Sequence, residues 1–257
     1  MKRVERKYGW LRDLPSQVPW FDHEGLLRAA RTPDVTAWRR FLRWCYDQGS
    51  EGSCTANSGQ GATRLRRAIL GMHDFDGARQ FLYAMTLRLT QPNPTDTGAT
   101  ISDTVRAEWL YGVPLESSWP YRTPLSQDPR KNAKVMAEAQ RHQLLGKAPV
   151  QQTQEAIEAC LAAGQPVQFG MMLHQSFESF AVQRTGIVPM PRMFERQLGG
   201  HAMYLFDYNR PKRKFYGPTS WGPTFGQDRL GILEFPYELI LDTDTAADFW
   251  TYITPEE

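Results

Sequence analysis

The sequence predicts an α+β fold with two lobes, a helical lobe followed by a lobe rich in β-strands. In the first half, small and apolar residues recur at helical spacing, whereas the second half carries short apolar runs typical of strands. The first long helix contains so many small residues that we expect it to be buried between two halves of the protein. The chain has 257 residues, of which 41% are hydrophobic and 23% charged, and this length allows a sizeable core.

Three helices are expected in the first half. Periodicity predicts a helix over residues 54–70, and Gly71 is a plausible end. A second helix is expected over residues 78–89, because a Gln-Pro-Asn-Pro segment that breaks helices follows it. A third is expected over residues 102–111.

The second half is expected to contain strands and short helices. Thr153 would cap a helix that continues to residue 163 and stops at Gly164. The change from one lobe to the other is expected between about residues 121 and 150. The remaining expected elements are strands over residues 166–173, 201–208, 212–217 and 230–235, and a short helix over residues 175–182.

The N-terminal segment is expected to be an arm. Residues 1–40 are irregular and rich in aromatic residues, and Trp10, Trp20 and Phe21 would pack onto the main body. Its basic beginning is followed by Tyr-Gly-Trp and by no apolar stretch, so no signal peptide is expected. Only 53 residues precede Cys54, so activation by removal of a long prosegment is not expected.

The charge and the cysteines exclude several classes of protein. A formal net charge of +2 is too small to indicate a nucleic-acid partner or an anionic membrane surface. No apolar run reaches the roughly 18 residues of a membrane-spanning helix. Cys45, Cys54 and Cys160 are too few for a disulfide framework and have no zinc-ligand spacing, which fits a reducing compartment. No metal or organic cofactor is implied.

Residues 47–57, Asp-Gln-Gly-Ser-Glu-Gly-Ser-Cys-Thr-Ala-Asn, indicate a thiol nucleophile. Cys54 stands at the expected start of a helix, where partial positive charge and free N–H groups favour a thiolate. Gln48 lies six residues upstream and could donate its amide to an oxyanion. The glycines between them allow tight turns and a close approach of a substrate carbonyl. By contrast, Cys45 and Cys160 lie among apolar residues and are expected to pack in the core.

This segment resembles the papain-like cysteine peptidases, in particular their bacterial and phage-encoded branch. The resemblance extends from about residue 40 to the C-terminus. Further landmarks in the family's order are Ser-Trp-Pro-Tyr at 118–121, Gly-His-Ala at 200–202, Ser-Trp-Gly at 220–222, Phe-Pro-Tyr at 235–237 and Asp-Phe-Trp at 248–250.

The resemblance implies a two-lobed fold with the active-site cleft between a helical lobe and a β-barrel-like lobe. The arm would comprise residues 1–40 and the catalytic domain residues 41–257, with the helical lobe over about 41–125 and the β-rich lobe over about 126–257. The implied substrate is a protein or peptide, cleaved through a thioester acyl-enzyme.

The resemblance also implies the roles of four residues. Cys54 would be the nucleophile, His201 the acid and base, and Gln48 an oxyanion donor beside the backbone N–H of Cys54. Thr219 stands where the family has an asparagine that orients the histidine, and its hydroxyl could accept the same hydrogen bond over a shorter reach. His23, His73, His142 and His174 have no comparable context and are expected at the surface or in packing.

Five further residues are expected to contact substrate. Gly98 matches a glycine loop that pairs with an extended substrate backbone, and a turn would explain this glycine equally well. Gly52 and Ser53 would line the adjacent subsite, Gly200 a wall of the pocket, and Trp221 a cover that shields the site from water.

Two alternatives stay open at this point. Thr219, Pro218 and Asp207 depart from the family pattern, which usually has glycine at position 207. These departures are compatible with a weakened active site. The protein would then be a structural or binding module with this fold, for example a component of a phage particle with other virion proteins as partners. Alternatively, the same chemistry could serve another acceptor, as in transpeptidation or cleavage of cell-wall peptides. We therefore expect a cytoplasmic protein or one incorporated in a phage particle.

Overall fold

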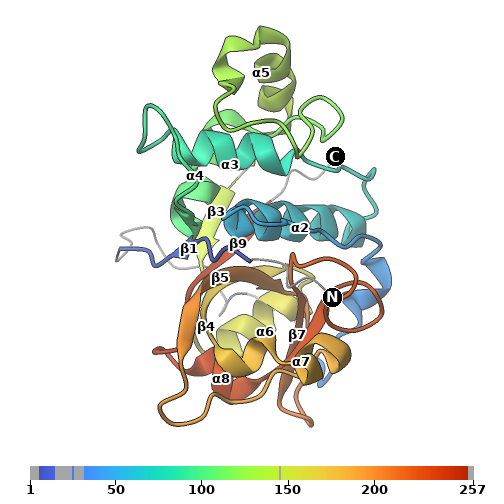
Figure 1. Cartoon of the computed structure of the whole chain (residues 1–257). Helices are drawn as coiled ribbons and strands as arrows, with labels where there is room; N and C mark the ends of the chain where they lie inside the picture. The colour runs from blue at the N-terminus through green and yellow to red at the C-terminus, as the bar shows by residue number, and fades with distance from the viewer. Residues whose placement is uncertain (1–5, 15–24, 26–31, 145, 254–257) are drawn as a thin grey trace.

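A long central helix divides the molecule into a helical side and a strand-rich side (Figure 1). The computed structural model describes residues 6–14, 25, 32–144 and 146–253. Helix α2 (Cys54–Ile69) crosses the middle, as its small residues predict. Eleven of its residues are buried, and a Cβ on Gly61 would come within 2.6 Å of the Tyr204 ring. Small residues therefore let the helix lie close to the neighbouring sheet.

The helical side surrounds one face of α2. Helices α3 (Arg79–Leu87) and α4 (Ile101–Tyr111) confirm two predicted helices with slightly different bounds. Thr100 caps α4 by accepting a hydrogen bond from the Asp103 backbone N–H. The other helical elements are η2 (Pro129–Lys131), α5 (Ala133–Ala139) and η3 (Gln140–His142), none of which the sequence analysis predicted.

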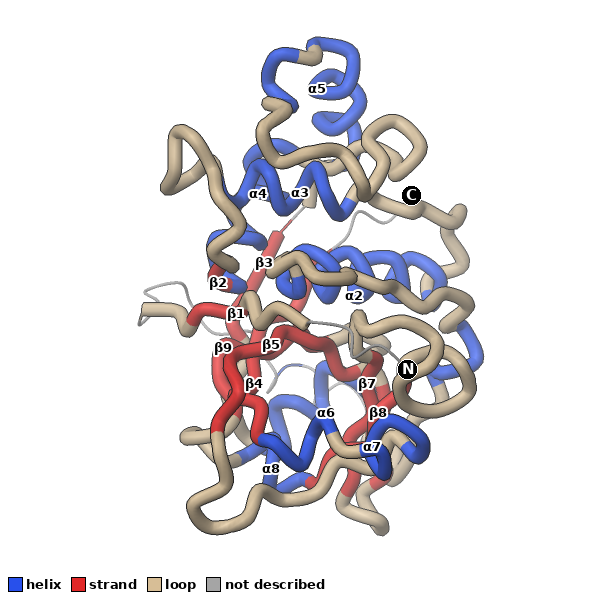
Figure 2. The backbone as a smooth tube through the Cα atoms, viewed as in Figure 1, coloured by secondary structure: helices blue, strands red, loops and turns tan. Residues whose placement is uncertain are grey.

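The strand-rich side contains two sheets (Figure 2). The larger is antiparallel in the order β3-β9-β4-β5, and the smaller in the order β6-β7-β8. The predicted α+β fold with a helical and a strand-rich side is confirmed, and among the described residues the strand-rich side consists of two open sheets and not a closed barrel. The bounds are β3 (Gly146–Pro149), β4 (Val167–His174), β5 (Gln197–Leu205), β6 (Asp207–Asn209), β7 (Lys214–Pro218), β8 (Ile232–Pro236) and β9 (Ala246–Ile253).

Short helices cover the larger sheet. Thr153 caps α6 (Gln154–Ala162) by accepting from the Ala156 N–H, as predicted. The single helix expected over residues 175–182 is instead two pieces, η4 (Gln175–Glu178) and α7 (Phe180–Thr185), while α8 (Tyr237–Leu241) was not predicted. Cys160 is fully buried in the core cluster beneath this sheet, which agrees with its expected packing role.

The N-terminal arm joins both sides of the molecule. Strand β1 (Trp10–Leu11) pairs in parallel with β2 (Ala99–Thr100), and η1 (Trp38–Phe41) follows later in the arm. Trp10 is buried, as expected, whereas the predictions for Trp20 and Phe21 lie outside the described residues.

Two features bear on domains and partners. Because α5 contributes Val135 and Ala139 to the helical core cluster, we propose that the change of lobes follows α5, later than residue 125.

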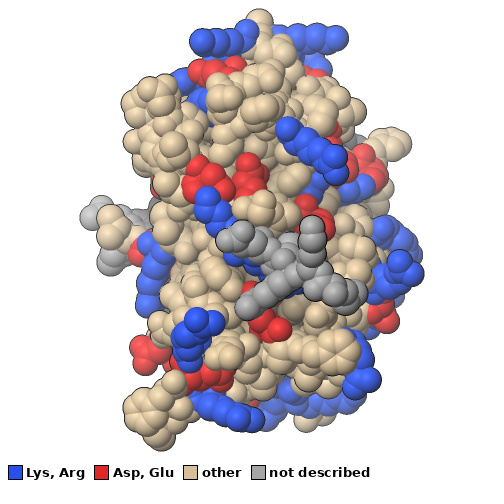
Figure 3. Space-filling view, in the orientation of Figure 1, with Lys and Arg blue, Asp and Glu red and all other residues tan. Residues whose placement is uncertain are grey.

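Lys, Arg, Asp and Glu side chains are interspersed on the face in Figure 3, so neither sign of charge dominates this face. Within the described part of the chain, every helix is too short or too polar to cross a membrane.

Candidate active site

Cys54 is the first residue of α2 and is completely buried. Its thiol lies against the backbone of Ala202, the residue that follows His201 on β5, and against the backbone of Gly9 in the arm. Helix α2 and strand β5 thus bring together two residues that are 147 positions apart in the sequence, Cys54 and His201.

His201 lies on β5, opposite Met171 of the neighbouring strand β4. Its Nε2 atom is 2.9 Å from the Thr219 Oγ1 atom, and its Nδ1 atom is buried without a hydrogen-bond partner. The Trp221 ring covers the imidazole at a centroid distance of 4.9 Å. One ring nitrogen is therefore held by the threonine, and the other remains available.

The contact with Thr219 is compatible with the tautomer that a general base requires. If the Nε2–H group donates to the threonine hydroxyl, Nδ1 carries the lone pair and can accept a proton. Thr219 itself is fixed by a backbone hydrogen bond from its N–H to the Gly231 carbonyl at 2.9 Å. A short side chain on a fixed backbone can thus reach the ring where the sequence resemblance expects an asparagine.

Gln48 is held on both ends of its side-chain amide. Ser220 Oγ donates to Gln48 Oε1 at 2.6 Å, and Gln48 Nε2 donates to the Glu51 carbonyl at 2.7 Å. Because a carbonyl only accepts, this second bond fixes which end of the amide carries nitrogen. A weaker contact of 3.4 Å joins Nε2 to the Lys7 carbonyl, so the remaining N–H group faces the arm.

The arm fills the cleft between the two sides. A Cβ on Gly9 would collide with the Gly52 carbonyl, and the Gly9 carbonyl accepts from the Ala99 N–H at 2.7 Å. Arg6 stacks over the Trp221 ring at 4.0 Å. At the other end, Trp10 packs so closely that a Cβ on Gly200 would collide with its carbonyl oxygen.

Burial under the arm determines the protonation of the pair. It raises the pKa of the Cys54 thiol to about 11, although the backbones of Ala202 and Gly9 oppose part of the rise. Burial, and then the positive charge of Arg6, lowers the pKa of His201 to about 3. The expectation that the helix terminus favours a thiolate is wrong for this covered state, because desolvation outweighs the helix dipole. Thiol and imidazole are both neutral here.

Four of the five expected substrate-contacting residues border the arm or His201. Gly52, Gly98 and Gly200 touch residues 9–10 of the arm, and Gly98 has a φ of 81°, which favours glycine. Trp221 covers His201.

The fifth residue, Ser53, is buried, and its hydroxyl is hydrogen-bonded to Tyr121. Its expected place in a substrate subsite stays a prediction.

Two departures from the family pattern, Asp207 and Pro218, have defined places in the fold. The Asp207 carboxylate accepts from the backbone N–H groups of Trp38 and Arg39 at 2.8 and 3.0 Å and so anchors η1. Pro218 ends strand β7 beside Thr219.

Sequence reasoning missed three contributors to the site. These are the arm residues 6–11, Ser220 as the partner of Gln48, and Asp96 at the edge of the cleft. The only local sign of the arm's role is a glycine between two aromatic residues, Tyr8 and Trp10.

Comparisons with known proteins find relatives along most of the chain, although no family model matches it. It is 32% identical over 215 residues to an uncharacterised peptidase C1-like protein, L477, of Acanthamoeba polyphaga mimivirus, covering 79% of this chain and 68% of that protein. The structure of xylellain, a cysteine protease from Xylella fastidiosa, superimposes with a TM-score of 0.88 at 28% identity, covering 100% of this chain and 99% of xylellain.

More distant structures share the fold. ProCathepsin B S9 from Trypanosoma congolense has a TM-score of 0.73 at 15% identity, with 98% of this chain and 88% of that one covered. A Carica candamarcensis cysteine protease, solved with E-64, has a TM-score of 0.62 at 16% identity, with 87% of this chain and 100% of that one covered.

Proposed function

The chain belongs to the papain-like, C1-like cysteine peptidases and is a cysteine-type peptidase, and from this premise we propose that Cys54 and His201 cleave peptide bonds in a cleft that the arm covers at rest. The observation that carries the proposal is the free, buried Nδ1 atom of His201, whose Nε2 is held by Thr219 and whose neighbour Ala202 contacts the Cys54 thiol through its backbone. The sequence around Cys54 further supports a place in the bacterial and phage-encoded branch of the family.

The proposed reaction has two halves. His201 Nδ1 accepts the thiol proton, and the Cys54 sulfur attacks the substrate carbonyl carbon. The resulting oxyanion receives hydrogen bonds from Gln48 Nε2 and the Cys54 N–H, each typically worth about 3 kcal/mol in the transition state. When the C–N bond breaks, His201 gives its proton to the leaving amine. Water then attacks the thioester, and its proton returns through His201 to the thiol as the acid product leaves.

The arm must leave before this reaction can occur. Arg6 covers Trp221, the Lys7 carbonyl faces Gln48, and Gly9 separates Cys54 from solvent. Departure of the arm admits water to the pair, which removes the cause of both pKa shifts. We therefore propose that the covered form is inactive and that the neutral pair becomes competent once uncovered.

Covalent labelling tests the proposal directly. The full chain is treated at pH 6 with E-64, the compound in the solved structure of the Carica candamarcensis relative. The wild type is compared with Gly9→Val, because any side chain at position 9 would collide with the Gly52 carbonyl and expel the arm. We expect slow labelling of the wild type and at least tenfold faster labelling of Gly9→Val, at Cys54 alone.

Cys54→Ala in the Gly9→Val background is the control, with Cys45 and Cys160 as internal reference thiols. Mass spectrometry of peptides locates the label. If Gly9→Val reacts only as the pH rises above about 8, Cys54 is an ordinary thiol and the structural or binding alternative replaces catalysis.

A further inference from the structure

Asp96 stands at the edge of the cleft with one carboxylate oxygen fixed and the other free for a cation. Its Oδ1 atom accepts from the Gly52 N–H at 3.0 Å and from the Tyr83 hydroxyl at 2.6 Å. The same hydroxyl accepts from the Gly98 N–H at 3.0 Å. The two glycines proposed to line the substrate subsites therefore also orient this carboxylate, and Oδ2 is the atom left over.

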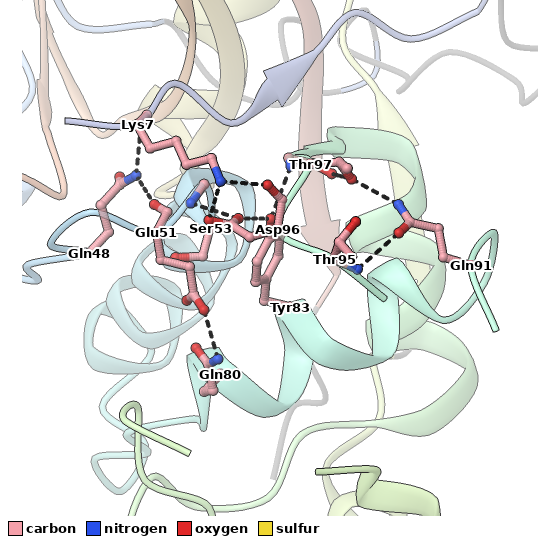
Figure 4. A network of polar contacts seen from close by, with 12 residues as sticks. Lys7, Gln48, Glu51, Ser53, Gln80, Tyr83, Gln91, Thr95, Asp96 and Thr97 are labelled. Carbon is pink, nitrogen blue, oxygen red and sulfur yellow. Dashed lines mark hydrogen bonds and ion pairs between the residues drawn. The ribbon is translucent and has the colours of Figure 1, made fainter. Parts of the chain in front are cut away.

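A lysine of the protein's own arm occupies this position (Figure 4). Lys7 Nζ lies 2.7 Å from Asp96 Oδ2 and 2.6 Å from the Asp96 carbonyl oxygen. The neighbouring Glu51 directs its Oε1 atom to Gln80 instead, at 2.9 Å. The carboxylate that meets the ammonium group is thus that of Asp96.

The backbone of Lys7 lies beside the proposed oxyanion donor, two residues before Gly9, whose backbone contacts the Cys54 thiol. Its carbonyl oxygen is the arm atom that approaches Gln48 Nε2, the proposed oxyanion donor, while its side chain extends across the cleft edge to Asp96 (Figure 4). One residue therefore presents a carbonyl to the oxyanion donor and a cation to the carboxylate. A substrate residue in the same place can make both contacts.

We infer that Asp96 is a specificity-determining residue, which selects lysine or arginine as the substrate residue that supplies the scissile carbonyl. This inference rests on the proposed function, because it identifies a preference at that same site. The Lys7 and Asp96 side chains are 45% and 22% exposed, so the pair is screened in part, and we expect a preference of about tenfold.

Peptide cleavage by the full chain with Gly9→Val is the experiment. Four peptides differ only at the residue before the scissile bond, which is lysine, arginine, norleucine or glutamate. We expect kcat/KM for lysine and arginine to exceed that for norleucine about tenfold, and glutamate to be the poorest. Adding Asp96→Asn should bring lysine to within about twofold of norleucine, since Asn keeps an acceptor for Gly52 and Tyr83 and loses the charge.

Glu155→Gln is the matched control, because it removes the same charge from an exposed site in α6. It should leave the lysine preference unchanged. The inference is overturned if the lysine preference survives Asp96→Asn, or if the Gly9→Val parent shows no lysine preference. If Gly9→Val fails to fold, Asp248→Ala frees the arm instead, because Asp248 binds Trp10 Nε1 and the Asp13 N–H.

A binding measurement separates this inference from the proposed chemistry. Fluorescence polarisation gives the Kd of the lysine and norleucine peptides for the Cys54→Ala, Gly9→Val protein, with and without Asp96→Asn. One outcome is that the protein binds the lysine peptide selectively, that Asp96→Asn abolishes this selectivity, and that the protein with an intact Cys54 turns over no peptide. This outcome supports the subsite and refutes catalysis. Turnover in which the lysine and norleucine peptides have the same Kd and the same kcat/KM supports catalysis and refutes the subsite.

Discussion

His201 Nε2 lies 2.9 Å from Thr219 Oγ1, and both side chains are buried. In this contact a threonine hydroxyl forms the hydrogen bond to the histidine ring that an asparagine amide forms in the family pattern. A hydroxyl can donate as well as accept, so it selects the ring tautomer less strictly than a carbonyl oxygen does. We therefore propose that Thr219 is a positioning residue, which acts on the reaction through His201.

Replacing Thr219 with valine keeps the shape of the side chain and removes the hydrogen bond. In the Gly9→Val background, we expect kcat/KM to fall about five- to tenfold, since a neutral hydrogen bond contributes about 1 kcal/mol. The pH–rate profile should also shift, because a ring with two unbound nitrogens has no preferred tautomer. Steady-state cleavage of a lysine-containing peptide across pH measures both. Thr219→Ser should retain activity, and equal rates for serine and valine would contradict this role.

The Ser220–Gln48 contact leads to a second prediction. Ser220→Ala removes the 2.6 Å hydrogen bond to Gln48 Oε1 and leaves the amide held by the Glu51 carbonyl alone. We expect kcat to fall about fivefold with little change in KM, because the oxyanion forms only in the transition state. Gln48→Ala should lower kcat further, and Ser220→Ala should add little in its presence. Additive losses would show that Ser220 acts elsewhere.

Local sequence signals predicted where Cys54 and His201 lie in the fold, and their catalytic roles stay a proposal. Cys54 at the start of α2 follows from glycines and helical periodicity within one short segment, and His201 on a strand follows from its neighbours. The strand β9 escaped prediction because nearly all its side chains are buried, including Phe249 and Trp250. A strand buried on both faces lacks the alternation that reveals strands.

The covering arm could not be predicted from local signals. Its contacts join residues 7–9 to residues 96–99, about 90 positions away, and no short-range rule selects such a partner. The direction of the Cys54 pKa was missed for the same reason. The helix terminus is visible in the sequence, whereas the burial that outweighs it involves residues distant in the sequence, Gly9 of the arm and Ala202 of β5.

The lowered pKa of His201 predicts how stability depends on pH. Its value of about 3 in the folded state is below the ordinary value of 6.5, so the unfolded chain binds the proton more tightly. The contribution of His201 to stability is complete above about pH 6.5 and declines as the pH falls toward 3. Melting temperatures from pH 7 to 4 should therefore fall less steeply for His201→Gln than for the wild type. Parallel curves would contradict the neutral, buried imidazole.

The anchor of the arm leads to two further predictions. Asp248 Oδ2 accepts from Trp10 Nε1 at 3.0 Å and from the Asp13 N–H at 2.8 Å, so it holds the arm beside the site. Asp248→Ala removes both bonds, and we expect at least fivefold faster E-64 labelling of Cys54. Asp248→Asn keeps an acceptor and should label slowly.

The same anchor should respond to pH. Burial raises the pKa of Asp248 to about 6 from its ordinary 3.8, although the hydrogen bonds from the Asp13 N–H and from Trp10 oppose part of the rise. Undocking the arm exposes Asp248 to water and lets it ionise at its ordinary pKa, so docking weakens as the pH rises from about 4 to about 6. In the wild type, the exposure of the arm, followed by hydrogen exchange of its amides, should increase between pH 4 and 6 after correction for intrinsic exchange rates. Asp248→Asn should flatten this change, because it cannot ionise, and an unchanged pH dependence would assign the effect to another group.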